Sequence, residues 1–232
     1  MDAAEIDSSQ MRRTLALSAV LLALVPIAFG ILIVVSGYPP QWGPFASGAV
    51  AWTIALALRS PVALVGIRLF GSIERAQTLV VAASGPAEEI VRLIAVLVIG
   101  RDLATAIWLG FGWATIEVAY TFINGAVIAR MANRTDPEAE RVRQLIPPAA
   151  FGPSAPIWAA LERTGVTAFH IGMTVIVAAA PITFLINAVV HSALNLTAVR
   201  FSQRWPIWAL EGLICVVGFG ALVVGLFLIG AF

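Results

Sequence analysis

Residues 84–92 read SGPAEEIVR, a stretch that places the adjacent carboxylates of Glu88 and Glu89 and the guanidinium of Arg92 inside an apolar run. The run extends from about Leu79 to Ile99, which is long enough to cross the hydrocarbon core of a bilayer as a helix. An ionisable group at that depth is costly, so we expect it to face the protein interior and to have a partner. The stretch therefore predicts a membrane-embedded functional site centred on these three groups.

The composition of the whole chain agrees with a membrane protein. Of its 232 residues, 60% are hydrophobic and only 12% are charged, which favours a polytopic helical bundle over a soluble domain. The net charge of +1 gives no reason to expect a nucleic-acid partner. The apolar run after Arg12 and Arg13 is longer than the core of a cleavable signal peptide, so we expect it to persist as the first span.

The apolar runs predict an all-α transmembrane bundle of about seven spans. The second run contains Pro61, which either kinks it or ends it near Arg59, and an ended helix would give eight shorter segments. The sequence predicts one integral membrane domain over residues 1–232, with the chemically informative motifs in residues 84–196. The expected helices are 14–35, a second from residue 45, 77–99, 103–129, 156–179, one from Pro181 to 199, and 206–230.

The arginines predict the orientation of these spans. With seven spans, eleven of the 14 basic residues fall on one side, one falls on the other, and two lie within spans. Loops rich in basic residues remain in the cytoplasm, so we expect a multi-pass protein of the cell membrane with a cytoplasmic N-terminus. The eleven are Arg12, Arg13, Arg59, Arg68, Arg75, Arg130, Arg134, Arg141, Arg143, Arg200 and Arg204, against Arg101 on the other side.

Polar residues recur at helical spacing on four of the expected spans, and their depths match. We expect Glu88, Glu89, His170 and His191 to be catalytic groups. Peptide hydrolysis needs an activated water, an acid for the leaving amine and donors for the oxyanion, and these side chains can supply them. The supporting residues that we expect beside them are Arg92, Glu117 and Asn195.

Each of these groups also has a purely structural interpretation. Glu89 and Arg92 could form an ion pair that stabilises only its own burial, and Glu162 with Arg163 is expected to be such a pair. A single histidine in a membrane helix often only joins two helices by a hydrogen bond. Trp113 is expected to serve packing, and Glu211, near the start of the last span, needs no special role.

Four motifs occur in order along the chain, and together they resemble a known group of enzymes. The motifs are EExxR at 88–92, GFGWAxxE at 110–117, ER followed by FH between 162 and 170, and HxxxN at 191–195. This arrangement resembles the glutamic-type intramembrane proteases, which include the CAAX-processing proteases, PrsW and the YhfC-like group. The Glu-Arg pair before Phe-His is most similar to the YhfC-like branch.

The resemblance implies that Glu88 and a histidine activate water without a metal or other cofactor. It also implies that His191 and Asn195 form an oxyanion site, and that Glu89 and Arg92 orient the base. The substrate would be a membrane-embedded protein or peptide within the lipid bilayer. Two departures stand out: the gap before the arginine is three residues rather than the four of CAAX proteases, and the histidine of their second motif is absent here, so His170 would replace it.

Two other functions remain open from the sequence. The same carboxylates and histidines could form the proton relay of a carrier, although the chain shows no internal repeat of the kind common in carriers. A zinc-dependent membrane hydrolase would need ligands such as two histidines and one glutamate, which are present, but the HExxH pattern is not.

Overall fold

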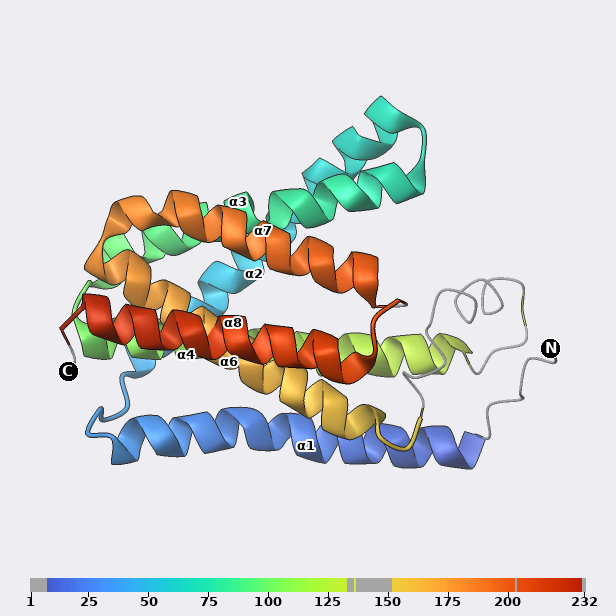
Figure 1. The fold of residues 1–232 in the computed structure, drawn as a ribbon, viewed down its shortest axis with the longest axis horizontal. Coiled ribbons are helices and arrows are strands. Elements are labelled where there is room, and N and C mark those ends of the chain that lie inside the picture. Colours follow the sequence, from blue (N-terminus) through green and yellow to red (C-terminus); the bar gives the residue numbers. More distant parts are fainter. Residues whose placement is uncertain (1–7, 133–135, 137–151, 203, 231–232) are drawn as a thin grey trace.

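The computed structural model describes residues 8–132, 136, 152–202 and 204–230, and this part of the chain is helical without strands. Within these described residues, seven long α-helices alternate in direction along one axis (Figure 1). The predicted all-α class is therefore confirmed. The elements are α1 (Ser8–Val35), α2 (Trp42–Phe70), α3 (Ile73–Ile99), α4 (Leu103–Ala132), α6 (Ala155–Ala179), the 3₁₀ turn η2 (Pro181–Thr183), α7 (Phe184–Phe201) and α8 (Ile207–Leu228).

Five of these helices are long and apolar enough to cross a membrane. The two others, α3 and α6, carry buried charged residues, which are Glu88, Glu89 and Arg92 in α3 and Arg163 in α6. Large apolar side chains such as Leu17, Ile31 and Val189 are exposed on the outside of the bundle, where acyl chains would cover them. The five candidate spans are Arg13–Val35, Trp42–Phe70, Leu103–Ile128, Pro181–Phe201 and Ile207–Leu228.

Helix α6 is the central element of the bundle. It packs against α1, α3, α4 and α8, and every residue from Thr167 to Ala178 is buried. A helix enclosed by other helices does not have to be apolar on all faces. This explains how α6 can carry Arg163 and His170 in the interior of the bundle.

The prolines act differently at two of the predicted boundaries. Pro61 does not end the second helix, because α2 continues through it to Phe70 and stops at Gly71, which has the left-handed φ of 58°. Such continuity through proline is tolerated in membrane helices. Pro181 does interrupt the chain as expected, since Ala180 is extended and η2 separates α6 from α7.

The ends of the bundle differ in charge. Arginines including Arg13, Arg68, Arg130 and Arg200 lie at the end where α1, α3, α6 and α8 begin (Figure 1). Arg101 lies at the opposite end, where its side chain donates to the carbonyl oxygens of Ala178 (3.0 Å) and Ala179 (3.3 Å). That arginine caps the carboxyl end of α6, where a cation is favourable. Between the expected helices 103–129 and 156–179, residues 133–151 lie outside the described residues apart from Asp136.

Candidate active site

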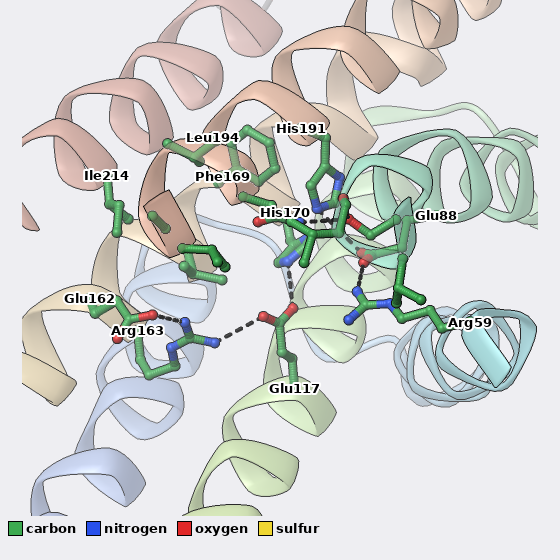
Figure 2. A pocket seen from close by; sticks show the side chains of 17 residues that line it. Arg59, Glu88, Glu117, Glu162, Arg163, Phe169, His170, His191, Leu194 and Ile214 are labelled. Carbon is green, nitrogen blue, oxygen red and sulfur yellow. Dashed lines mark hydrogen bonds and ion pairs between the residues drawn. The ribbon is translucent and has the colours of Figure 1, made fainter. Parts of the chain in front are cut away.

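A cavity of about 240 Å³ lies within the half of the bundle nearer the arginine-rich end. Helices α3, α4, α6 and α7 form most of its wall, and α2 and α8 complete it (Figure 2). Its lining combines apolar side chains such as Phe169 and Leu194 with a dense set of ionisable ones. The ionisable and amide side chains on it are Arg59, Glu88, Glu117, Glu162, Arg163, His170, His191 and Asn195.

A Gly-Pro pair in the middle of α3 sets how closely α3 and α7 approach each other beside the cavity. A Cβ on Gly85 would lie 2.3 Å from the carbonyl oxygen of Ala188 and from Ser192 Oγ, so only glycine allows this crossing. Pro86 has no N–H and leaves the carbonyl of Ala82 without its helical donor. The Ser192 hydroxyl donates to that carbonyl at 2.7 Å. The crossing brings the two glutamates of α3 opposite His191.

Glu89 is fully enclosed and binds two partners. Arg92 Nε donates to both of its carboxylate oxygens, at 3.0 and 3.2 Å, and His191 Nδ1 lies 3.0 Å from Glu89 Oε1. A carboxylate paired with arginine accepts hydrogen bonds only, so Nδ1 of His191 carries a proton. In a neutral ring the Nε2 of His191 is then an acceptor. Glu89 therefore fixes both the orientation and the tautomer of His191.

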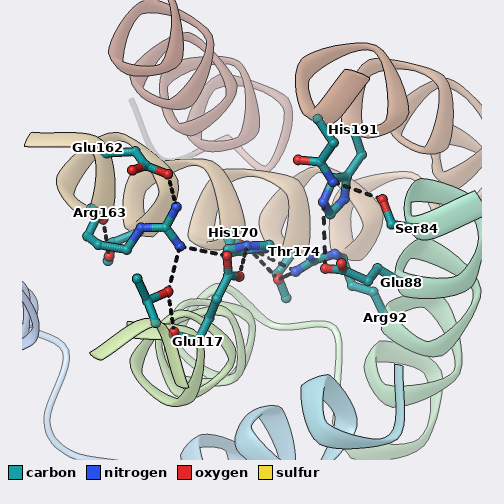
Figure 3. A network of polar contacts seen from close by, with 12 residues as sticks. Ser84, Glu88, Arg92, Glu117, Glu162, Arg163, His170, Thr174 and His191 are labelled. Carbon is teal, nitrogen blue, oxygen red and sulfur yellow. Dashed lines mark hydrogen bonds and ion pairs between the residues drawn. The ribbon is translucent and has the colours of Figure 1, made fainter. Parts of the chain in front are cut away.

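Arg92 links the two histidines, and it is itself completely buried. Its Nη1 donates to Thr174 Oγ1 (2.6 Å) and to the carbonyl of His170 (3.2 Å), and its Nη2 lies 2.8 Å from His170 Nδ1. The guanidinium carbon is 4.3 Å from the centre of the Trp113 ring, a favourable cation–π distance. Figure 3 shows this network between α3 and α6.

The tautomer of His170 follows from Arg92. A guanidinium can only donate, so His170 Nδ1 must accept, and the ring proton then lies on Nε2. That Nε2 donates to Glu117 Oε2 at 2.6 Å. Gly110 on α4 lies against α6, where a Cβ added to Gly110 would come within 2.7 Å of the Cα of Ile171. This close packing of α4 and α6 brings Glu117 to His170. Both nitrogens of His170 are engaged.

Glu117 connects His170 to a second arginine on α6. Arg163 Nη1 donates to Glu117 Oε1 at 2.9 Å and to Thr121 Oγ1 at 3.3 Å, while its Nη2 pairs with Glu162. The adjacent pair predicted from the sequence is therefore present. Arg163 faces inward, however, with a side chain only 9% exposed, and does not extend to the membrane surface.

Glu88 has one oxygen bound and one open to the cavity. Its Oε1 accepts from Arg59 Nη2, and its Oε2 has no hydrogen-bond partner among the described residues although it is buried. His191 Nε2 lies 3.6 Å from that Oε2, which is too long for a direct hydrogen bond. Both residues line the cavity, and neither of these two atoms has a hydrogen bond to another described residue.

Asn195 lies one turn after His191 on α7 and lines the same cavity. Its Nδ2 donates to Ser84 Oγ at 2.8 Å, and that hydroxyl donates to the carbonyl of Val81 at 2.7 Å. Asn195 is thus anchored to α3 rather than free to rotate. Nearby, Phe169 packs against the rings of His170 and His191, with centroid distances of 5.5 and 5.1 Å.

Three side chains have donor atoms close enough to hold a metal ion. One atom each of Glu88, Glu117 and His170 lies within 4.8 Å of the others. A metal ligand must offer a lone pair, but His170 Nε2 carries its proton because Arg92 occupies Nδ1. The carboxylates are also paired with Arg59 and Arg163. This donor set therefore fits a metal poorly in the arrangement observed.

The structure brings together the residues that the sequence predicts as catalytic or supporting, from helices α3, α4, α6 and α7. It also adds residues that the sequence interpretation missed. Arg59 was assigned to the membrane flank, but it lies about three turns inside α2 and pairs with Glu88. Its position within an apolar run was the available signal. Thr174, one turn after His170, supports Arg92.

Glu211 lies in the first turns of α8, near the start of the last span as expected. Its side chain is buried, and its Oε2 has no hydrogen-bond partner within the described residues.

Comparisons of the chain with protein-family models, with curated proteins and with solved structures found no match. A function must therefore be argued from this site alone.

Proposed function

We propose that this protein is an intramembrane endopeptidase that hydrolyses a peptide bond of a membrane protein or peptide. The observation that carries the proposal is the pair of open atoms at the cavity, Glu88 Oε2 and His191 Nε2, 3.6 Å apart. One water oxygen can lie within hydrogen-bond distance of both atoms at that spacing. The site is enclosed by apolar helices, so this water would be separated from bulk solvent.

In the proposed reaction the water attacks the carbonyl carbon while Glu88 accepts its proton. The new C–O bond forms a tetrahedral intermediate, and the C–N bond breaks as the proton passes to the leaving amine. His191 Nε2 aligns the water by accepting a hydrogen bond from it, and shares the proton of the water with Glu88, since Nδ1 is held by Glu89. The network of ion pairs contains four carboxylates and three guanidiniums. A proton added to His191 therefore brings the formal charge of the network to zero.

The other groups act through these two. Glu89 and Arg92 position His191, while Glu117 and Arg92 hold His170 beside it, with the two imidazole centroids 5.6 Å apart. Asn195 is a neutral donor one turn after His191 that lines the cavity, and we assign it to the oxyanion. Its amide must leave Ser84 to reach a substrate.

We further propose that all seven long helices span the membrane and that the N-terminus is cytoplasmic. The burial of the charged side chains of α3 and α6 against neighbouring helices supports spanning by these two helices, and the arginine-rich end supports the orientation. The chain would then be a multi-pass protein of the cell membrane whose catalytic cavity lies toward the cytoplasmic side.

The proposal is tested by mass spectrometry of new protein N-termini in membranes from cells that carry the wild type or Glu88→Gln. Glu211→Gln is the matched control, because it neutralises another buried carboxylate that does not line the cavity. New termini within membrane proteins should appear with the wild type and the control and disappear with Glu88→Gln. Equal termini at equal protein levels in all three would refute an endopeptidase.

A zinc-dependent hydrolase is the second candidate, favoured by the spacing of Glu88, Glu117 and His170. The two candidates differ in their response to a chelator. We expect the purified wild-type protein to retain cleavage after treatment with a chelator and removal of metals. Loss of cleavage that zinc restores would instead support the metal-dependent reaction.

A further inference from the structure

Arg59 occupies a boundary position that the proposed reaction does not explain. Its side chain is 31% exposed, whereas the side chain of its partner Glu88 is 2% exposed. It lines the catalytic cavity and also a second, open hollow of about 580 Å³ between α2, α3 and α4, here called the outer groove. Val80 is likewise shared by the two hollows. The pair of Arg59 and Glu88 therefore stands in the wall between them.

The outer groove is suited to an apolar segment. Leu56, Ala57, Ala63, Val80 and Tyr120 contribute to its lining, and Tyr120 is 41% exposed. Arg59 is the only ionised side chain among the residues that line it. A membrane segment that lies in this groove contacts apolar surface along its length and one guanidinium at its inner edge.

Access from the outer groove to Glu88 requires Arg59 to move. A guanidinium that loses its partner at bilayer depth is costly, and Arg59 Nε already lacks a hydrogen-bond partner among the described residues. An incoming segment that supplies a carboxylate removes this cost, because it replaces Glu88 as the anion. A neutral segment does not.

We propose that Arg59 is a specificity-determining residue that binds an aspartate or glutamate carboxylate of the membrane segment entering through the outer groove. The exchange transfers the guanidinium from Glu88 Oε1 to the incoming carboxylate and frees the glutamate for the reaction. This selection rests on the proposed function for its purpose, but binding of the segment requires no hydrolysis.

The test measures binding of two fluorescent transmembrane peptides of about 20 apolar residues that differ only in a central Glu or Gln. The proteins are Glu88→Gln variants in phosphatidylcholine nanodiscs, so no hydrolysis by the proposed mechanism interferes and no anionic lipid competes. Removal of the Glu88 charge leaves Arg59 without its anion. We therefore expect Glu88→Gln to bind the Glu peptide about tenfold tighter than the Gln peptide, and the wild type to show a smaller preference.

Further variants separate Arg59 from a general effect of charge. The double variant Glu88→Gln/Arg59→Gln should bind the two peptides within about twofold, as expected when a charge-assisted bond is lost. The matched control Glu88→Gln/Arg68→Gln removes an exposed arginine near the end of the same helix and should keep the preference for the Glu peptide. Glu88→Gln/Arg59→Lys should also keep this preference, because it retains a cation. This variant replaces Glu88→Gln/Arg59→Gln as the test if the latter does not fold.

The proposal is overturned if Glu88→Gln shows no preference, if the preference survives Arg59→Gln, or if it is lost with Arg68→Gln. A wild-type protein that binds the Glu peptide selectively but cleaves nothing would contradict the endopeptidase and leave the role of Arg59 in place. A protein that cleaves membrane peptides but binds the Glu and Gln peptides equally would support the endopeptidase and overturn the role of Arg59.

Discussion

The two histidines of this protein are alike in burial and differ in what they leave open. His170 and His191 are 2% and 4% exposed, and each lies beside a glutamate. His170 has partners on both nitrogens, Arg92 at 2.8 Å and Glu117 at 2.6 Å. His191 has a close partner only on Nδ1, and its Nε2 faces Glu88 Oε2 at 3.6 Å.

Arg92 and two carboxylates create this difference. In His170, Nδ1 accepts from Arg92 and Nε2 donates to Glu117, so the proton of that ring lies on Nε2. In His191, Nδ1 donates to Glu89, and Arg92 reaches this ring only through that carboxylate. The two rings therefore have opposite tautomers. Arg92 occupies the second nitrogen of His170, whereas the second nitrogen of His191 has no such partner among the described residues.

The largest expected effect comes from His191, the histidine whose Nε2 has no close partner among the described residues. His191→Gln removes the nitrogen that shares the proton of the water, and we expect cleavage to fall by about 10³-fold. The measurement is the rate of cleavage of a membrane peptide by purified protein in liposomes, with thermal unfolding as the check on folding. A decrease of less than about tenfold in a folded variant would remove His191 from the reaction.

Arg92→Gln should affect both rings at once. Without the guanidinium, Glu89 is a buried carboxylate with one partner, and we expect unfolding to become easier by about 3 kcal/mol. Activity should fall by about 10²-fold because His191 loses its fixed orientation. Denaturant unfolding in detergent and the liposome assay give the two values. A variant of unchanged stability would show that the ion pair with Glu89 contributes little.

His170, which has partners on both nitrogens, should matter less for cleavage than His191. His170→Gln keeps an amide that can bond to Arg92 or Glu117, so we expect a rate loss of about tenfold, as for displaced positioning groups. The same liposome assay provides the comparison. A loss equal to that of His191→Gln would mean that the two rings act as one unit and that their different contacts do not separate their roles.

Ser192→Ala tests the crossing of α3 and α7 that brings the two glutamates of α3 opposite His191. The carbonyl of Ala82 loses its donor, and an unsatisfied buried acceptor costs about 1–3 kcal/mol. Thermal unfolding should detect this change. Ser202→Ala is a matched control, because that hydroxyl donates within its own exposed turn and its removal should leave the unfolding temperature unchanged. An unaffected Ser192→Ala would show that another donor reaches Ala82.

The smallest expected effect lies at the far end of the bundle. Asp102 Oδ1 accepts from the Thr105 backbone N–H at 3.0 Å, and this bond lowers the pKa of Asp102. The cap therefore stabilises the fold above the ordinary aspartate pKa, and its contribution is lost as the pH falls through the lowered value. Asp102→Ala should cost about 1 kcal/mol at neutral pH without changing cleavage. Any loss of activity would connect this end to the site.

The sequence predicted the helices well and the convergence of the polar groups correctly, since apolar length and helical spacing determine both. Lipid does not solvate charges, so charges within long apolar runs are expected to face inward, and those of α3 and α6 are buried. It could not predict whether Pro61 ends α2, because neighbouring helices decide what happens to the freed carbonyl. It misplaced Arg59 for the related reason that an arginine beside a proline resembles the end of a span.

The different contacts of the two histidines were beyond sequence reasoning. Spacing along α3 places Glu88, Glu89 and Arg92 on neighbouring faces, but it does not say which glutamate meets Arg92 and which meets Arg59. That choice depends on the crossing at Gly85 and Pro86, which sets the rotation of α3 against α7. The contacts between helices, rather than the motif, distinguish the two rings.

Nitrogen-15 NMR of protein labelled only in histidine tests this account most directly, because the chain contains two histidines. At a pH where both rings are neutral, we expect one ring protonated at Nε2 and the other at Nδ1, with His170→Gln removing the first signal and His191→Gln the second. Arg92→Gln should keep the Nε2–H form of His170, because the Glu117 carboxylate still accepts from that nitrogen. If both rings show the same tautomer, or if His170 is protonated at Nδ1, the assignment of a free Nε2 to His191 and not to His170 is wrong.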